Sequence, residues 1–227
     1  MSIGLIIPAL NEAASIGQVI SAIPPLANLE IVVVDNGSTD QTAQIARENG
    51  ATVLAQPHKG YGRACLMGID YFKKKYDKPD TIVFMDGDFS DYPSDIIRLL
   101  EEINNGADIV IGSRAMGNSE KKSMTSVQRF GNWLSSKLLY LRWQVSVTDL
   151  GPFRAIKWEK LLALEMKDKT YGWTVEMQAK ALKKDYNYVE IPVNYRERIG
   201  VSKVSGTLKG AFLAGYKILF TIAKHSF

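Results

Sequence analysis

With 227 residues, 46% of them apolar and 23% charged, the chain has the size and composition of one large folded domain. Its net charge of +4 is mild and dispersed, which favours small anionic partners such as nucleotides or phospholipid head groups and argues against nucleic acid. One cysteine and two histidines exclude an internal disulfide and argue against a zinc hydrolase, so carboxylates would have to hold any divalent ion, which favours Mg²⁺ or Mn²⁺.

Strands and helices are predicted to alternate through the first half of the chain. The N-terminus enters an apolar run directly, with no basic leader, so no signal peptide is expected. Apolar, often β-branched runs predict strands at 2–9, 30–34, 51–55, 80–85 and 107–112. Helices are predicted at 12–23, from about residue 39, at 60–74 and at 93–104. This alternation predicts an α/β fold with a Rossmann-like, mainly parallel central sheet flanked by helices.

The pattern becomes irregular after residue 114. A polar loop is expected at 115–124, followed by helices at 126–140, 158–165 and 173–184 and by strands at 153–156 and 188–195. The tail, 207–223, is predicted to be one apolar, amphipathic helix. No uninterrupted apolar stretch reaches about 18 residues, so no membrane-spanning helix is expected, and the protein is expected to be cytoplasmic.

Acidic side chains follow several of the predicted strands directly. Glu12 comes after the first strand, Asp35 after the second, and Asp86 and Asp88 after the fourth. The carboxyl ends of parallel strands meet at one edge of a sheet, where α/β proteins bind their ligands. The sequence therefore predicts that these acids converge on one cleft.

The Asp86-Gly87-Asp88 motif has the composition of a metal and diphosphate site. Two carboxylates one residue apart can approach a hard cation, and Gly87 lets the backbone come close to a ligand. A solvated acidic turn is the alternative, and the position after a buried strand favours the metal. Asp35 can accept a hydrogen bond from a base or a ribose, and Asn36 can both donate and accept, although the two also suit a simple turn.

Four N-terminal segments resemble family-2 glycosyltransferases of the GT-A fold. They are IIPALNE (6–12), VVVDNGSTD (32–40), MDGDFSD (85–91) and IGSR (111–114). The nearest resemblance is to the branch that transfers sugars to dolichyl or polyprenyl phosphate, which is similar to dolichol-phosphate mannose synthases. QRFGNWLSS (128–136), TDLGPFRAI (148–156), YGWTVEMQ (171–178) and RERIGVSKVSG (196–206) fit the same branch, so the resemblance covers nearly the whole chain.

The resemblance implies a nucleotide-sugar donor, with Asp86, Asp88 and Ser90 at the metal. Relatives often carry two acids where this chain has Asp35-Asn36, and Gln or His in place of Ser90. Lys59 is added to the donor site because it lies in a glycine-containing segment with two cations, which suits phosphate contact. The residues expected to bind the nucleotide-sugar are Pro8, Leu10, Glu12, Val34, Asp35, Asn36, Lys59, Asp86, Gly87, Arg114, Arg129, Arg198 and Lys203.

The implied reaction is an inverting, in-line displacement at the anomeric carbon. Asp88, through the metal, would stabilise the leaving diphosphate. Asp149, before the Leu150-Gly151-Pro152 turn, is the favoured acidic group near the acceptor, and Glu176 is the second candidate. A lipid phosphate is already ionised, so a strong general base is not required. The expected division is a glycosyltransferase domain at 1–205, with a nucleotide-binding half at 1–114 and an acceptor half at 115–205, followed by an amphipathic helix at 206–227.

The composition of the tail affects which class of acceptor is expected. Its apolar residues and its lysines (Lys209, Lys217 and Lys224) suit a helix in the bilayer interface, and they equally suit packing on the domain or between two copies. A polyprenyl-phosphate acceptor, with peripheral membrane contact, is the first expectation. A soluble or protein-linked acceptor is the second. A nucleotidyltransferase ranks third, because the N-terminus lacks a glycine-rich loop with a basic residue, and a non-catalytic nucleotide-binding module also remains open.

Overall fold

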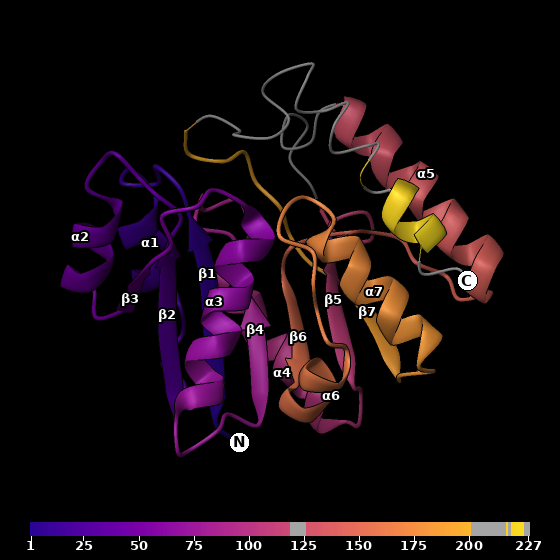
Figure 1. The fold of residues 1–227 in the computed structure, drawn as a ribbon, viewed down its shortest axis with the longest axis horizontal. Helices are drawn as coiled ribbons and strands as arrows, with labels where there is room; N and C mark the ends of the chain where they lie inside the picture. The colour runs from indigo at the N-terminus through magenta and orange to yellow at the C-terminus, as the bar shows by residue number, and fades with distance from the viewer. Residues whose placement is uncertain (119–125, 201–216, 218, 225–227) are drawn as a thin grey trace.

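The computed structural model describes residues 1–118, 126–200, 217 and 219–224 (Figure 1). The strands are β1 (Ile3–Ala9), β2 (Leu29–Asp35), β3 (Thr52–Ala55), β4 (Thr81–Phe84), β5 (Ile109–Ser113), β6 (Arg154–Lys157) and β7 (Tyr188–Pro192). The helices are α1 (Ile16–Ser21), α2 (Thr42–Glu48), α3 (Tyr61–Lys74), the 3₁₀ turn η1 (Pro93–Asp95), α4 (Ile96–Asn104), α5 (Ser126–Trp143), α6 (Trp158–Ala163) and α7 (Trp173–Lys183).

Within the described residues, one seven-stranded sheet has the order β3-β2-β1-β4-β6-β5-β7. Four of its strand pairs are parallel, as expected, whereas β6 runs antiparallel to both β4 and β5. The chain enters β6 at the edge where β4 and β5 end. The turn before β6 therefore lies at the same edge of the sheet as the loops that follow β4 and β5.

Each face of the sheet is covered by helices because both sides of the parallel strands are apolar. In β1, Leu5 and Ile7 face the core formed with α1, α2 and α4, whereas Ile6 faces the core formed with α3, α6 and α7. Figure 1 shows α3 and α7 in front of the sheet and α4 behind it. The resulting three-layer α/β/α arrangement confirms the predicted fold class.

A third apolar cluster joins α5 and α7 to the described end of the tail. Ile222 is 5% exposed and packs in this cluster, and Lys217 lies 3.0 Å from a carboxylate oxygen of Asp168. Residues 217 and 219–224 are helical, and the rest of the expected helix at 207–223 lies outside the described residues. In the part of the chain that the structure describes, no helix combines the length and apolarity needed to cross a membrane.

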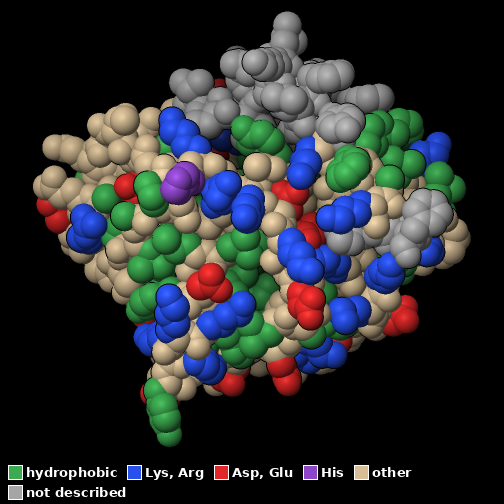
Figure 2. Space-filling view, viewed as in Figure 1, with side chains coloured by type: hydrophobic (Ala, Val, Ile, Leu, Met, Phe, Trp, Pro, Cys, Tyr) green, Lys and Arg blue, Asp and Glu red, His purple; other side chains and the backbone are tan. Residues whose placement is uncertain are grey.

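Exposed apolar side chains gather on α5, where Figure 2 shows a hydrophobic area at the upper right. Trp133 is 56% exposed, Tyr140 48% and Leu141 61%. Phe220 in the tail is 50% exposed.

Two predicted boundaries differ from the structure in ways that affect the site. The first helix begins at Ile16 rather than at Glu12, because the Glu12 carbonyl accepts from the amides of Ser15 and Ile16 in a preceding turn. The last strand ends at Pro192 rather than at Tyr195. After Pro192 the chain leaves β5 and lies against the loop that follows β4.

Candidate active site

The strand register brings the predicted acids to one edge of the sheet. Ala9 at the end of β1 pairs with Asp35, and Ile6 pairs with Phe84, the last residue of β4. Neighbouring strands lie about 5 Å apart, so Asp35 and Asp86 follow strands that are separated by about 10 Å across β1. The topology therefore places both acidic loops at the same end of three adjacent strands.

The antiparallel β6 adds the turn that contains Asp149 to this edge. Arg154, its first residue, pairs with Phe84 of β4 and with Ile111 of β5. The residues just before Arg154 therefore lie beside the loops that follow β4 and β5. Asp149 and Arg114 meet there.

Arg114 and Asp149 form a closed ion pair. The backbone amide and Nε of Arg114 donate to Asp149 Oδ2 at 2.8 and 2.7 Å, and Nη2 donates to Oδ1 at 2.7 Å. Burial disfavours the guanidinium charge, but Asp149 more than offsets this and the pKa of Arg114 is raised well above its usual value. The fully buried Arg154 supports the turn by donating to the Gly151 carbonyl, and the Tyr195 ring lies 5.0 Å from the Arg114 guanidinium.

Asp88 has partners on both carboxylate oxygens. Its Oδ1 accepts from the amide of Ser90 at 3.0 Å and from the Ser90 hydroxyl at 2.5 Å. Its Oδ2 lies 2.8 Å from Nη1 of Arg198. Ser90 thus orients Asp88, and Arg198 neutralises it.

Asp86 and Asp91 are buried acids with oxygens that lack partners. Oδ1 of Asp86 and both carboxylate oxygens of Asp91 accept no hydrogen bond. Burial, and then the charge of Asp88, raise the pKa of Asp86 to about 7. Burial, and then the charges of Asp86 and Asp88, raise the pKa of Asp91 well above its usual value. Such groups are costly without a cation, a proton or a ligand donor nearby.

These residues fit a divalent cation that is completed by a substrate. Asp86, Asp88 and the Ser90 hydroxyl offer hard oxygen atoms, and Oδ1 of Asp86 has no competing partner. In the described ranges, no three carboxylate, imidazole or thiol groups converge as a ready-made metal site. Mg²⁺ and Mn²⁺ are commonly held by one or two carboxylates together with substrate phosphates, and this donor set matches that mode.

The nucleotide-side residues Asp35 and Asn36 differ in their availability. Asp35 Oδ1 accepts from the amide of Ser38 at 3.0 Å, which closes a turn. The Asn36 amide is used by the backbone of the next loop, because it donates to the His58 carbonyl at 2.8 Å and accepts from the Gly60 amide at 2.7 Å. Asn36 therefore fixes the loop that carries Lys59, where an acid would leave the His58 carbonyl without its donor.

Several other predicted donor contacts are altered by burial. Val34 is fully buried in the core beneath α3, so its side chain is not available to a nucleotide. Glu12 is 9% exposed, and its carboxylate accepts from the Ser15 hydroxyl at 3.2 Å. A side chain at Gly87 would meet core atoms of Ile16 at 3.4 Å, so Gly87 faces the core rather than a ligand. Phe89, with φ of 62°, is the residue of this loop that adopts the left-handed conformation.

The remaining expected donor contacts lie in different settings. Pro8 and Leu10 are half-buried at the end of β1, and Lys59 is exposed in the loop before α3. Arg129 is exposed on α5. Lys203 lies outside the described residues.

Asp149 and Glu176 do not present free carboxylates to an acceptor, contrary to expectation. Asp149 is fully buried, and Arg114 binds both of its oxygens. Glu176 is 3% exposed, accepts from the backbone amide of Asp168 at 2.7 Å and pairs with Lys180 at 2.7 Å. Burial of charge requires such partners, and here they occupy the carboxylate oxygens of both acids.

Of residues 193–199, the sequence predicted a role for Arg198 and did not predict one for Arg196. Arg196 lies between the rings of Phe89 and Tyr92, 3.4 and 4.3 Å from their centroids, and its Nε donates to the Phe89 carbonyl at 2.6 Å. The amide of Ile199 donates to the Asp88 carbonyl at 3.0 Å. The charged run 196–198, directly after a strand, was the available signal. Asp91 was also missed, although it ends the acidic motif.

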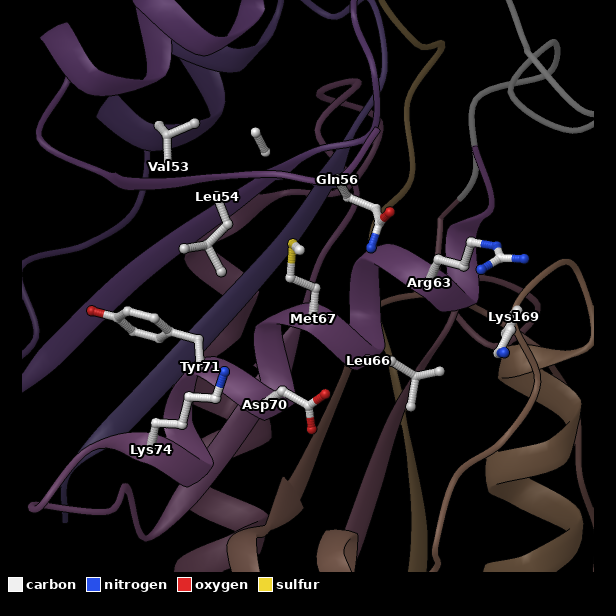
Figure 3. Close-up of a pocket in the computed structure, with 11 residues that line it drawn as sticks. Val53, Leu54, Gln56, Arg63, Leu66, Met67, Asp70, Tyr71, Lys74 and Lys169 are labelled. Carbon is white, nitrogen blue, oxygen red and sulfur yellow. The ribbon is translucent and has the colours of Figure 1, made fainter. Parts of the chain in front are cut away.

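A groove of about 570 Å³ lies elsewhere, between the edge strand β3 and α3 (Figure 3). Leu54 and Met67 supply apolar atoms, and Arg63, Lys74 and Lys169 supply cations. Asp35, Asp86 and Asp88 do not line it. It is therefore distinct from the acidic edge of the sheet.

Comparison with known proteins identifies the family to which the chain belongs. The model of the family described as "Glycosyl transferase family 2" matches residues 5–162. The chain belongs to this family. This glycosyltransferase is 34% identical over 214 residues to an uncharacterised glycosyltransferase of Mycobacterium tuberculosis, covering 94% of each chain. It is 32% identical over 214 residues to a dolichyl-phosphate hexose transferase of Haloferax volcanii, covering 92% of this chain and 89% of the relative.

The fold of this family-2 glycosyltransferase also matches a solved structure. Glucosyl-3-phosphoglycerate synthase from Mycobacterium tuberculosis, crystallised with Mn²⁺, UDP and glucosyl-3-phosphoglycerate, superposes with a TM-score of 0.78 at 21% identity. The match covers 99% of this chain and 79% of that chain. The GT-A fold that the sequence predicts is therefore confirmed.

Proposed function

We propose that this glycosyltransferase moves a hexose from a UDP- or GDP-sugar to a polyprenyl phosphate, with inversion, assisted by Mg²⁺ or Mn²⁺. The observation that carries the proposal is the meeting of incompletely satisfied acids and arginines at one edge of the sheet. Asp86 and Asp88 supply oxygens for a cation, and Arg114 and Arg198 supply positive charge beside them. The dolichyl-phosphate hexose transferase relative, which aligns over most of the chain, supports a lipid-phosphate acceptor.

In this proposal each side of the edge has a separate task. A bound divalent ion supplies charge that stabilises the departing nucleoside diphosphate. Asp35, with Pro8 and Leu10, binds the nucleoside end, and Asn36 holds the loop that carries Lys59. Glu12 is also proposed to contribute to the nucleotide site, because it follows β1 shortly after Pro8 and Leu10.

Arg114 is the group proposed to face the phosphates. Asp149 accepts from its backbone amide, Nε and Nη2, which fixes the plane of the guanidinium. A pre-oriented guanidinium suits an ionised phosphate oxygen, and such an oxygen needs no general base to attack the anomeric carbon. Asp149 and Glu176 act as positioning residues, and Arg129 and Lys203 remain proposed phosphate contacts.

The membrane side of the proposal rests on α5 and the tail. Exposed Trp133, Tyr140 and Leu141 on α5, with Phe220 in the tail, give an apolar surface of the kind that enters a bilayer interface. Lys137 lies 5.3 Å from the Trp133 ring and adds a cation for anionic head groups. Flotation with vesicles of anionic phospholipid tests this. The full chain is expected to float, and Leu141→Asp is expected to reduce the floated fraction severalfold.

Transfer of radiolabelled sugar is the direct test of the reaction. UDP- and GDP-sugars are offered with undecaprenyl phosphate, with a water-soluble alcohol or without acceptor, each with Mn²⁺ or with EDTA. Label is expected in the lipid only with Mn²⁺, and Asp88→Ala is expected to lower the rate by about 10³-fold. Transfer to the soluble alcohol alone would replace the acceptor assignment. A wild-type rate for Asp88→Ala would overturn the metal assignment.

A further inference from the structure

Arg198 occupies the oxygen that a metal ion would need. Asp88 Oδ1 is committed to the amide and hydroxyl of Ser90, at 3.0 and 2.5 Å. Oδ2 is the other oxygen, and Nη1 of Arg198 lies 2.8 Å from it. The Asp88 side chain is 5% exposed, so little room remains around it for a second partner.

The backbone on both sides of Arg198 is fastened to the acidic loop. The amide of Arg196 donates to the Ser90 carbonyl and that of Ile199 to the Asp88 carbonyl, each at 3.0 Å. The Arg196 side chain is held between two aromatic rings and donates to the Asp91 carbonyl at 3.2 Å. These bonds keep residues 196–199 on the loop whatever the Arg198 side chain contacts.

The Arg198 side chain itself is held less firmly. It is 24% exposed, and Asp88 is its salt-bridge partner. Tyr195 and Asp86 interact with it in addition to Asp88. A long side chain on an anchored backbone can change partner by rotation about its own bonds, without unfolding of the segment.

We propose that Arg198 is an exchangeable counter-ion of Asp88, which leaves this carboxylate when a divalent cation arrives and then pairs with the diphosphate that accompanies the cation. The inference rests on the proposed function and adds an order to it. A cation without nucleotide must displace a guanidinium that gains no new partner. A cation with a diphosphate displaces a guanidinium that gains an anion, so cation and nucleotide bind cooperatively.

The physical reason is the repulsion between two cations at one oxygen. A guanidinium at hydrogen-bond distance and a divalent ion at coordination distance from Oδ2 would lie less than about 5 Å apart. In a site as buried as this one, that repulsion is weakly screened. The opposite arrangement is a fixed guanidinium that orients a ligating carboxylate from behind, as outer partners of metal sites do. The two arrangements predict opposite effects of removing Arg198.

The affinity for Mn²⁺ without nucleotide distinguishes an exchangeable Arg198 from a fixed one. Free Mn²⁺ is measured by its electron paramagnetic resonance signal during titration into the full-length protein, Arg198→Ala and Arg198→Gln. Arg47→Ala is the matched control, because it removes the same charge from an exposed position on α2, where the side chain donates to the Ala43 carbonyl. Exchange predicts that both Arg198 variants bind Mn²⁺ about tenfold more tightly than the parent protein, while the control changes less than about twofold.

In a second titration, with nucleotide in place of Mn²⁺, removal of Arg198 is expected to weaken binding. UDP, and separately GDP, are titrated into the same proteins at saturating Mn²⁺ in a calorimeter. The Arg198 variants are expected to bind the nucleotide that the parent binds about tenfold more weakly. Tighter Mn²⁺ binding together with weaker nucleotide binding cannot arise from misfolding.

The outcomes also distinguish the inference from the proposed function. Unchanged or weaker binding of Mn²⁺ alone by the Arg198 variants overturns the exchange, even if transfer activity is found. Absence of nucleotide binding by the parent protein counts against the proposed function and leaves the Mn²⁺ result to decide the exchange. Melting curves of both variants verify folding, and Arg198→Gln retains a polar side chain of similar reach.

Discussion

The carboxylates on the two sides of the sheet edge differ in how completely they are satisfied. On the donor side, Asp86 has one buried oxygen without a partner and Asp91 has two. On the acceptor side, Asp149 is bound at both oxygens by Arg114, and Glu176 by backbone amides and Lys180. Both sets are buried, so exposure does not separate them.

This difference indicates which buried acids have carboxylate oxygens available for a ligand. A buried carboxylate with a full set of partners stabilises its surroundings and has no free oxygen for a substrate. A buried carboxylate without partners destabilises the protein until a cation or a donor arrives. Activity and stability should therefore respond in opposite directions when Asp86 is replaced, and stability should fall when a partner of Asp149 is removed.

The largest effect is expected from Asp86→Asn. It removes one of two carboxylates proposed to hold the metal, so the transfer rate should fall by more than about 100-fold. The same change removes a buried charge that has one oxygen without a hydrogen bond, so the metal-free protein should gain about 1 kcal/mol and melt about 2–4 °C higher. Initial rates and melting curves measure both quantities.

Asp88→Asn is the matched control for that experiment. Asp88 has Ser90 and Arg198 as partners, so its substitution should lower both activity and melting temperature. The comparison also depends on pH. Because the pKa of Asp86 is raised to about 7, its favourable contribution is present below its ordinary pKa of 3.8 and is lost as the pH rises through 7. The stability gain of Asp86→Asn should therefore grow from pH 4 to pH 7, and a constant gain would contradict the raised pKa.

Arg114→Ala should produce the largest loss of stability on the acceptor side. It leaves the fully buried Asp149 charge without a cation, which typically costs about 3–5 kcal/mol. The melting temperature should fall by about 10 °C. The double variant Arg114→Ala/Asp149→Ala should recover part of this loss in chemical denaturation. If the double variant were less stable than the sum of the single changes, the closed pair would not be the dominant interaction.

Glu190→Gln should have a smaller effect of the same kind. Glu190 on β7 accepts from the amide and hydroxyl of Thr148, at 2.9 and 2.5 Å, and from the Tyr188 hydroxyl at 2.6 Å. The amide replacement keeps one acceptor oxygen, so about 1–2 kcal/mol should be lost. Tyr188→Phe removes one of these bonds and also the bond that Gln178 Nε2 donates to the phenol at 2.8 Å. A loss for Tyr188→Phe larger than that for Glu190→Gln would show that the bond from Gln178 contributes more than the bond to Glu190.

The donor side was predictable because its information is local. Apolar strands that end in Asp35 and Asp86, alternating with helices, predict a parallel sheet and the edge at which its loops meet. The register confirms that β2 and β4, which carry these acids at their ends, both pair with β1 in parallel. Side-chain direction was less accessible. Val34 precedes Asp35 in the sequence, yet it points into the core, and the position of a side chain at Gly87 also faces core atoms.

The acceptor side was less predictable because its partners are distant in sequence. Asp149 was expected near an acceptor, but its pairing with Arg114, 35 residues away, depends on the antiparallel direction of β6. No periodicity in the short strand 154–157 indicates that direction. Glu176 pairs with Lys180 four residues on, which the sequence could indicate, but its other partners are the backbone amides of Lys167 and Asp168, which carry no sequence signal.

The smallest effect is expected for the partly exposed ion pair between Lys217 and Asp168. Lys217 pairs with Asp168 at 3.0 Å, with side chains 36% and 8% exposed, and the amide of Thr170 also donates to Asp168. Burial raises the pKa of Asp168, but the Thr170 amide and Lys217 outweigh it, so the pKa is lowered overall. Lys217→Met should therefore cost about 0.5–1 kcal/mol at neutral pH, after allowance for screening by solvent.

A lowered pKa fixes how that cost depends on pH. The ion pair contributes above the ordinary pKa of an aspartate, near 3.8, and its contribution is lost as the pH falls through the lower folded value. The difference between the parent protein and Lys217→Met should shrink toward zero in acid. Lys73→Met is the control, since Lys73 and Asp70 are 3.5 Å apart with side chains 51% and 59% exposed, and its loss should be undetectable. Equal losses for the two lysines, measured by denaturant titration, would mean that the packing of the tail rather than the charge of Lys217 holds Asp168 in place.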